Sequence, residues 1–171
     1  MDTSQDLLIR IGRAGLVQAK WTNDILDEAL GNLARNRPDI TQDKLTRLRE
    51  LINSAIPDCL VAGYEPLIDG LKLPDPKDRH VLAAAIKAGA QVIVTANLKH
   101  FPAEHLAPWN VEAKSLDDFV LDQISIDDRA VFACVQAIAD SRERPPVTID
   151  DVLSQLERAG LVESAAALRT N

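Results

Sequence analysis

The chain has 171 residues, the size of one domain with a small appendage, and its 46% hydrophobic but only 4% aromatic composition predicts an aliphatic core. No apolar run approaches the roughly 18 residues of a membrane span, and the N-terminus lacks a basic-then-apolar signal pattern, so we expect a cytoplasmic protein with no membrane partner. A net charge of −7 excludes a general nucleic-acid coat protein, but it allows a nuclease with a local basic patch.

The first third of the chain reads as helices around one short strand. A helix is expected over residues 6–16, followed by a strand at 16–21. Thr22 and Thr41 have hydroxyl side chains suited to helix caps, and each precedes a run with apolar residues at helical spacing. We therefore expect two further helices, one starting at each threonine.

The middle of the chain alternates strands and helices. Residues 59–73 contain short apolar pieces interrupted by glycine and proline, typical of a strand with an irregular connection. A helix ending at Gly89 follows, then a β-branched run at 90–97 of the kind found in buried parallel strands, and a last strand at 110–115. This alternation predicts an α/β sandwich with a mainly parallel sheet.

The last part of the chain contains helices only. Ser115 can cap a helix in the α/β part, and from Asp127 onward every predicted element is helical. We therefore divide the chain into an α/β domain at residues 1–125 and a helical C-terminal extension at residues 126–171.

Common catalytic motifs are missing from the sequence. It contains no GxSxG, Walker loop, GxGxxG after a strand, or HExxH pattern. Cys59 and Cys134 share no zinc-ligand spacing and are expected to be reduced packing residues. His80, His100 and His105 are scattered, and such histidines are more often surface or hydrogen-bonded residues than ligands.

Carboxylates are the remaining candidates for chemistry. Asp75, Pro76 and Asp78 fit the N-cap, N1 and N3 positions of a helix, where oxygens satisfy free N–H groups and proline lacks one. Glu28 lies early in its own helix and could likewise be a favourable dipole partner. Local sequence alone leaves capping and catalysis open as alternatives.

The order of the elements favours a metal site. Asn97 follows the strand VIVT, and the helix start with Asp75 and Asp78 can reach the same carboxyl edge of a parallel sheet, where ligands collect. Carboxylates and an amide, without a thiol or imidazole cluster, suit a hard cation such as Mg²⁺ or Mn²⁺.

Three segments together resemble the PIN-domain family of nucleases. They read WTNDILDEALGNL, DPKDRHVLAAAIKAGAQVIVTANLKHFP and DDFVLDQI, and the likeness is strongest to bacterial VapC-type toxins with a helical C-terminal extension. The resemblance implies a PIN-like α/β/α sandwich and a divalent-metal-dependent endoribonuclease that hydrolyses RNA phosphodiester bonds. It further implies a cognate antitoxin protein as a partner and a homodimer.

The resemblance also implies roles for individual residues. Glu28 and Asp78 correspond to metal-binding acids, with Asp75 as an auxiliary acid one turn away. Asn97 stands where many family members have a further aspartate, and Thr95 would orient that loop. RNA would be steered by three basic residues, Arg35, Arg37 and Arg47. The alternative is that these arginines only form a solvated helix face.

One departure from the family pattern concerns the N-terminus. Family members open with a hydrophobic strand that carries the first catalytic aspartate, whereas this sequence starts almost directly on the following helix. Three explanations are open: an omitted upstream start, a strand supplied by another chain, or a natural truncation. The alternative function is therefore a catalytically impaired PIN module that acts as a binding or dimerisation partner, and a third interpretation is a domain whose carboxylates only cap helices.

Overall fold

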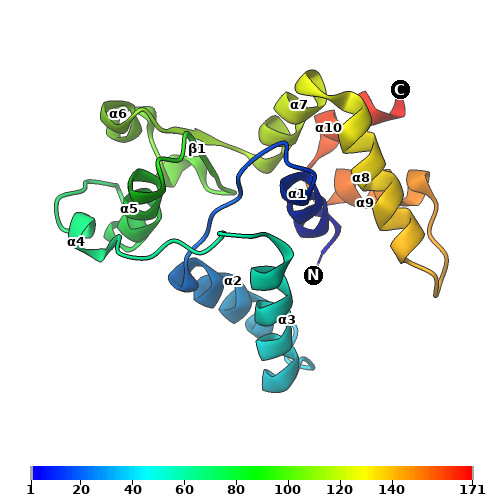
Figure 1. Ribbon diagram of the computed structural model, residues 1–171, viewed down its shortest axis with the longest axis horizontal. Helices are drawn as coiled ribbons and strands as arrows, with labels where there is room; N and C mark the ends of the chain where they lie inside the picture. Colours follow the sequence, from blue (N-terminus) through cyan, green and yellow to red (C-terminus); the bar gives the residue numbers. More distant parts are fainter. Residues whose placement is uncertain (1, 171) are drawn as a thin grey trace. The chain divides into compact units, whose positions relative to one another are not determined.

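The computed structural model describes residues 2–170, which form two compact units (Figure 1). One unit joins the N-terminal residues up to Gln18 to the residues from Ser115 onward, and the other comprises Ala19–Lys114. No helix among the described residues is long and apolar enough to cross a membrane.

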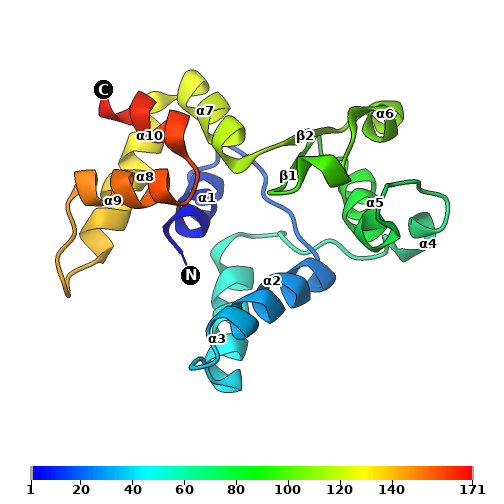
Figure 2. The same ribbon diagram turned by 180° about the vertical axis from the view of Figure 1, so that it is seen from behind.

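The first unit is a bundle of five helices (Figure 2). These are α1 (Thr3–Arg13), α7 (Leu116–Ile126), α8 (Asp128–Ser141), α9 (Ile149–Arg158) and α10 (Val162–Arg169). Helix α1 packs on α8 and α9, while α10 packs on α7 and α9. The fully buried side chains between them are aliphatic, as the composition predicts: Leu7, Ile11, Val120, Val131, Val135, Ile138, Val152 and Leu156.

The start of α10 is capped by a side chain from another helix. Leu161, the residue before α10, offers no side-chain hydrogen bond. Asp117 of α7 instead accepts hydrogen bonds from the backbone N–H groups of Glu163 and Ser164 at 3.1 and 2.9 Å, and from the Ser164 hydroxyl at 2.6 Å. Since these N–H groups have no partner within the helix, Asp117 fixes α10 against α7.

Removal of this cap is expected to destabilise the bundle. Asp117→Ala should lower the free energy of unfolding by about 2 kcal/mol, because hydrogen bonds to a charged group are lost and helix donors become unpaired. Urea denaturation followed by circular dichroism measures the change. Asp118→Ala is the matched control, since Asp118 is the exposed neighbour on the same helix. Equal stability losses in the two variants would contradict the interhelical cap.

The second unit contains the sheet and the segments around it. Its helices are α2 (Asn23–Asn36), α3 (Gln42–Ala55), α4 (Glu65–Ile68), α5 (Arg79–Ala88) and α6 (Ala103–Leu106). Three short 3-10 turns are η1 (Pro76–Asp78), η2 (Leu98–His100) and η3 (Ala107–Trp109). The strands are β1 (Val92–Val94) and β2 (Glu112–Lys114).

The sheet is parallel, as predicted, but smaller. Strand β1 pairs with β2 over three positions, from Val92 opposite Glu112 to Val94 opposite Lys114. The strand expected at 16–21 is not formed as a ladder; Trp21 makes only an isolated parallel bridge to Leu60. That segment has no further backbone partner among the described residues, and a strand without a paired neighbour cannot extend.

The predicted helix caps are confirmed. The hydroxyls of Thr22, Thr41 and Ser115 each accept a hydrogen bond from the backbone N–H three residues later, at 3.0, 3.3 and 3.1 Å. Gly89 ends α5 at a φ of +66°, a left-handed conformation that glycine adopts without the strain of a side chain. These signals are local, so the sequence alone was enough to find them.

Helix α5 joins the sheet to the core of the second unit. Its buried residues Leu82, Ala83 and Ala84 pack in one hydrophobic cluster with Ile93 of β1 and Leu106 of α6. The cluster therefore fixes the start of α5 relative to the carboxyl end of β1.

Tyr64 belongs to the same core and connects it to α2. It is the only tyrosine of the chain and is 4% exposed, and its hydroxyl donates a hydrogen bond to the carboxylate of Asp24. Burial first, and then the hydrogen bond to Asp24, raise the pKa of Tyr64 to about 12.

This shift predicts a loss of stability at high pH. A tyrosine in the unfolded chain ionises near pH 10. Because folded Tyr64 keeps its proton up to about pH 12, the unfolded state loses its proton first as pH rises. The contribution of Tyr64 to stability is thus complete below pH 10 and is lost between about 10 and 12. Ultraviolet titration of tyrosinate measures the pKa directly.

Two variants test the physical cause. Asp24→Asn should lower the pKa of Tyr64, because the carboxylate that favours the neutral phenol is gone. Tyr64→Phe should lose less stability than the wild type between pH 10 and 12, because phenylalanine has no hydroxyl proton to lose. A wild-type tyrosine titration centred at pH 10 would contradict the buried environment.

Helices α1 and α7 belong to the same compact unit as the C-terminal helices. The sequence-based boundary between residues 125 and 126 instead falls after almost the whole of α7. Packing into a compact unit is distinct from independent folding, so the domain boundary stays a prediction.

Candidate metal centre

Asp75 caps the entry to α5, as the sequence predicts. Its Oδ1 accepts a hydrogen bond from the backbone N–H of Lys77 at 2.9 Å, and Pro76 occupies the first position, where no N–H is needed. The helix begins as the 3-10 turn η1 before continuing into α5 at Arg79. Asp78 lies at this junction, where its side chain makes no capping hydrogen bond.

Asp78 carries an unsatisfied oxygen. Its side chain is 21% exposed, but Oδ2 is buried and has no hydrogen-bond partner among the described residues. Nδ1 of His100 lies 2.8 Å from this oxygen, although the angle does not meet the geometry of a hydrogen bond. The Asp78 oxygen and the His100 nitrogen thus face one another at short range.

Three ligand atoms gather at this point. One atom each from Asp75, Asp78 and His100 lie within 4.8 Å of one another. Two carboxylates and an imidazole are known ligands of divalent cations. The buried, unpaired oxygen of Asp78 fits this interpretation, because a cation would satisfy it. The donor set therefore suits a divalent metal ion.

Glu28 has a different histidine partner. Its Oε1 lies 2.8 Å from Nε2 of His80, which is in the first turn of α5. The Glu28 side chain is 59% exposed and His80 only 13%, and the other ring nitrogen of His80 is buried without a partner. Glu28 is not one of the three residues whose ligand atoms cluster. Its role as a metal ligand stays a prediction.

The loop after β1 brings Thr95, Asn97 and His100 together. The backbone N–H of Asn97 donates to the Thr95 hydroxyl at 3.0 Å, and the N–H of His100 donates to the Asn97 carbonyl at 3.0 Å. The Thr95 N–H donates to the carbonyl of Lys114, also at 3.0 Å. Thr95 therefore links the loop to the end of the sheet, and its role in orienting the loop for catalysis stays a prediction.

The predicted RNA-binding arginines differ in their contacts. Arg35 bonds to Asn32, and Arg37 makes two hydrogen bonds to Asp39 at 3.0 and 2.9 Å. No partner of Arg47 is found among residues 2–170. Arg47 lines a surface depression of about 600 Å³ on α3, and the acidic residues Asp43 and Glu50 line it too. The local charge is thus mixed, and RNA contact stays a prediction.

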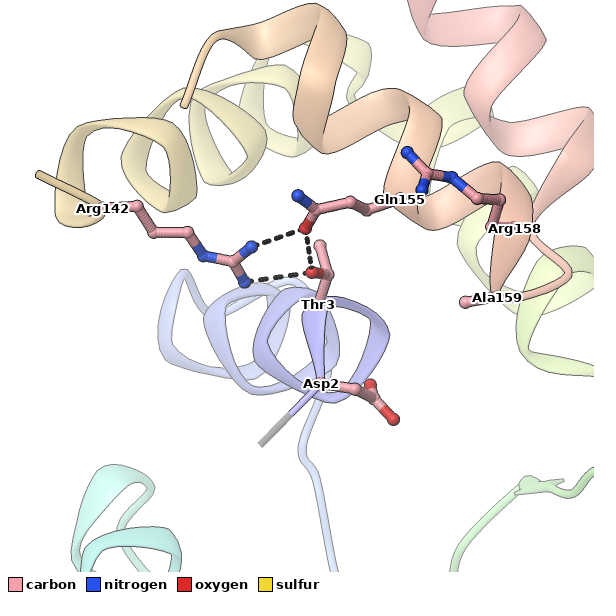
Figure 3. A pocket seen from close by; sticks show the side chains of 6 residues that line it. All are labelled: Asp2, Thr3, Arg142, Gln155, Arg158 and Ala159. Carbon is pink, nitrogen blue, oxygen red and sulfur yellow. Dashed lines mark hydrogen bonds between the residues drawn. The ribbon is translucent and has the colours of Figure 1, made fainter. Parts of the chain in front are cut away.

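A separate pocket of about 410 Å³ lies in the helical bundle (Figure 3). Arg142 donates to the Gln155 side chain at 2.6 Å and to the Thr3 hydroxyl at 3.0 Å. The Thr3 hydroxyl in turn donates to Gln155 at 2.6 Å. These bonds tie α1, α8 and α9 together, so the pocket has a structural explanation. Its lining includes neither Glu28 nor the three clustered ligands.

Sequence reasoning missed the two histidines as partners of the acids. The sequence pattern favours surface or hydrogen-bonded roles for His100 and His80, yet each lies 2.8 Å from a predicted site carboxylate. The available signal was position: His80 is two residues after Asp78, and His100 three residues after Asn97.

Comparisons with known proteins identify the family of the chain. A family model described as "PIN domain" matches residues 2–99, more than half of the chain. The chain belongs to the PIN-domain family. This membership and the small parallel sheet with additional C-terminal helices confirm the predicted fold class. A second family model, "VapC50 C-terminal domain", matches residues 116–170 of this PIN protein.

One curated relative is similar over part of the PIN protein. It is "Putative ribonuclease VapC50" of Mycobacterium tuberculosis strain H37Rv, 44% identical over 94 residues. The aligned stretch covers 55% of this chain and 55% of the relative, so the match spans about half of the relative's length. No solved structure matches the chain.

The pairing of Glu28 with His80 predicts the tautomer of this histidine. Because Nε2 faces the Glu28 carboxylate, the neutral ring should keep its proton on Nε2 and leave Nδ1 bare. Long-range ¹H–¹⁵N correlation spectra distinguish the two tautomers. Glu28→Ala should weaken this preference, while His105 serves as the unaffected control. A proton found mainly on Nδ1 would contradict the pairing.

Proposed function

We propose that the PIN protein is a divalent-metal-dependent endoribonuclease that hydrolyses RNA phosphodiester bonds, and that it is the toxin of a toxin-antitoxin pair. The observation that carries this proposal is the cluster of Asp75, Asp78 and His100 at the start of α5 and the end of the β1 loop. PIN-family membership and similarity to a protein named a ribonuclease support the same activity.

The cofactor would be Mg²⁺ or Mn²⁺. Such an ion, when bound, lowers the pKa of a coordinated water and stabilises negative charge on phosphate oxygens. Asp78 would be the central ligand, because its buried Oδ2 has no hydrogen-bond partner among the described residues. Asp75 would assist through the oxygen that is not used for the helix cap.

Glu28 and Asn97 complete the proposed active site. Glu28 would serve as the second metal-binding acid, and His80 would hold its carboxylate in place through the contact at 2.8 Å. Asn97 would contact the metal or its water through an amide oxygen, with Thr95 setting the loop. Both roles follow from the family resemblance. They also fit the positions of the two residues, because Glu28 contacts His80 of α5 and Asn97 lies in the loop that leads to His100.

Substrate steering would fall mainly to Arg47. Arg37 is already engaged by Asp39, and the hydrogen bonds between them lower the pKa of the Asp39 carboxyl. Arg47 has no such partner among residues 2–170 and can turn toward a phosphate. Because the chain carries a net charge of −7, any RNA attraction must be local.

The proposed partners follow from the resemblance to VapC-type toxins. A cognate antitoxin would hold the enzyme inactive, and the protein would act as a homodimer in the cytoplasm. Co-expression with the protein encoded beside this gene, followed by size-exclusion chromatography with light scattering, measures both associations.

A second candidate function is a PIN module that binds partners without catalysis. The observation that favours it is the position of Glu28, which contacts His80 and is not among the three clustered ligand residues. A protein of this kind would bind divalent metal weakly and would leave RNA intact.

RNA cleavage tests the enzyme proposal. Wild-type protein with Mn²⁺ or Mg²⁺ should cut RNA, and chelation with EDTA should stop cleavage. Asp78→Asn and Glu28→Gln should each lower the rate at least about 100-fold, since each would remove charge that fixes the metal. Gel separation of end-labelled RNA measures the products.

Asp69→Asn is the matched control, because Asp69 is an exposed acid of the same unit that follows α4. It should cleave at the wild-type rate. Cleavage that persists in both Asp78→Asn and Glu28→Gln would refute the assignment, and no cleavage by the wild type would favour the binding module.

A further inference from the structure

We propose that His100 is a direct metal ligand that makes this centre select Mn²⁺ over Mg²⁺. The proposal rests on the metal site of the proposed function and adds a ligand and a metal preference that the family resemblance does not supply. It concerns binding, so it can be tested without RNA.

The position of Nδ1 is the first support. It lies 2.8 Å from Oδ2 of Asp78. One ligand atom each of Asp75, Asp78 and His100 lie within 4.8 Å of one another. The distance of 2.8 Å is close to the separation of two atoms that bind the same metal ion, and the carboxylate of Asp75 lies in the same cluster. The two atoms are therefore placed to share a cation.

The backbone holds His100 in this position. Its N–H bonds to the Asn97 carbonyl at 3.0 Å, and the next residue, Phe101, donates to the Leu98 carbonyl at 3.1 Å. The Phe101 side chain is 5% exposed and belongs to the core cluster that includes α5 and β1. The turn that carries the imidazole is therefore held by backbone hydrogen bonds and by the buried side chain of Phe101.

Both aspartates leave oxygen available beside this nitrogen. Asp75 uses Oδ1 for the cap, and no hydrogen bond to its Oδ2 is found among the described residues. Asp78 makes no capping bond, and its Oδ2 is the buried oxygen without a partner. The centre thus offers two carboxylates and one imidazole.

This donor set discriminates between the two candidate ions. Mg²⁺ prefers an all-oxygen shell and keeps much of its water. Imidazole is a better ligand for first-row transition ions, and Mn²⁺ accepts both nitrogen and carboxylate oxygen. A ligand nitrogen should therefore raise the affinity for Mn²⁺ much more than that for Mg²⁺.

Metal titration of the 171-residue chain without RNA tests the proposal. Electron paramagnetic resonance of free Mn²⁺ gives its affinity, and competition with Mg²⁺ gives the selectivity ratio. His100→Asp replaces the nitrogen by oxygen, so it should reduce the Mn²⁺:Mg²⁺ ratio at least about tenfold, since changing even an outer-shell partner of a metal ligand has an effect of that size. Circular dichroism checks that each variant is folded.

Spin-echo spectra of bound Mn²⁺ provide a direct readout of ligation. The wild type should show coupling to an imidazole nitrogen, and both His100→Asp and His100→Ala should lose it. His105→Asp is the matched control, because His105 lies in α6 with its Nε2 4.0 Å from Glu104 and is not in the cluster. It should keep the coupling and the selectivity ratio.

The outcomes separate this proposal from the nuclease assignment. An unchanged ratio in His100→Asp, nitrogen coupling that survives in His100→Ala, or no measurable Mn²⁺ binding would each overturn the role of His100. RNA cleavage could still be present in the first two cases. Conversely, His100-dependent Mn²⁺ selectivity in a protein that leaves RNA intact would support the ligand assignment and reject the nuclease.

Discussion

The hydrogen bond from the Lys77 N–H to Asp75 Oδ1, at 2.9 Å, determines how the candidate centre is built. It starts the turn η1, and that turn places Asp78 at the entry to α5. The alanine-rich face of α5 packs in the core with β1, so the cap also sets Asp78 against the loop that follows the strand. Capping and metal binding are therefore compatible roles, because a carboxylate has two oxygens and the cap uses one.

The fold was predictable from sequence where its causes are local. Thr22 and Ser115 cap helices through a hydrogen bond to the third following residue, so residue type and spacing suffice. The segment at 16–21 was not predictable in this way, because a strand depends on a distant partner. Trp21 finds Leu60 at one position only, and the expected strand is reduced to a bridge.

The same distinction applies to the centre. Asp75 and Asp78 can be placed together from the sequence because they belong to one helix start, whose pattern is visible in a few residues. The contact of His80 with Glu28 spans 52 positions, and that of His100 with Asp78 depends on the turn η2 as well as on packing of β1. A single histidine carries no local pattern that reports such a partner, so both contacts needed the three-dimensional structure.

Carboxylate oxygens without hydrogen-bond donors, rather than acidic residues as such, distinguish the candidate metal centre from a helix cap among the described residues. Asp117 also stabilises a helix start, but both of its carboxylate oxygens accept hydrogen bonds from the first turn of α10. Asp75 gives one oxygen to its cap, and Asp78 gives none. A cation would gain little at Asp117, since its oxygens already have donors, whereas at Asp78 it would satisfy a buried acceptor. The same residue type thus serves structure in one unit and is available for chemistry in the other.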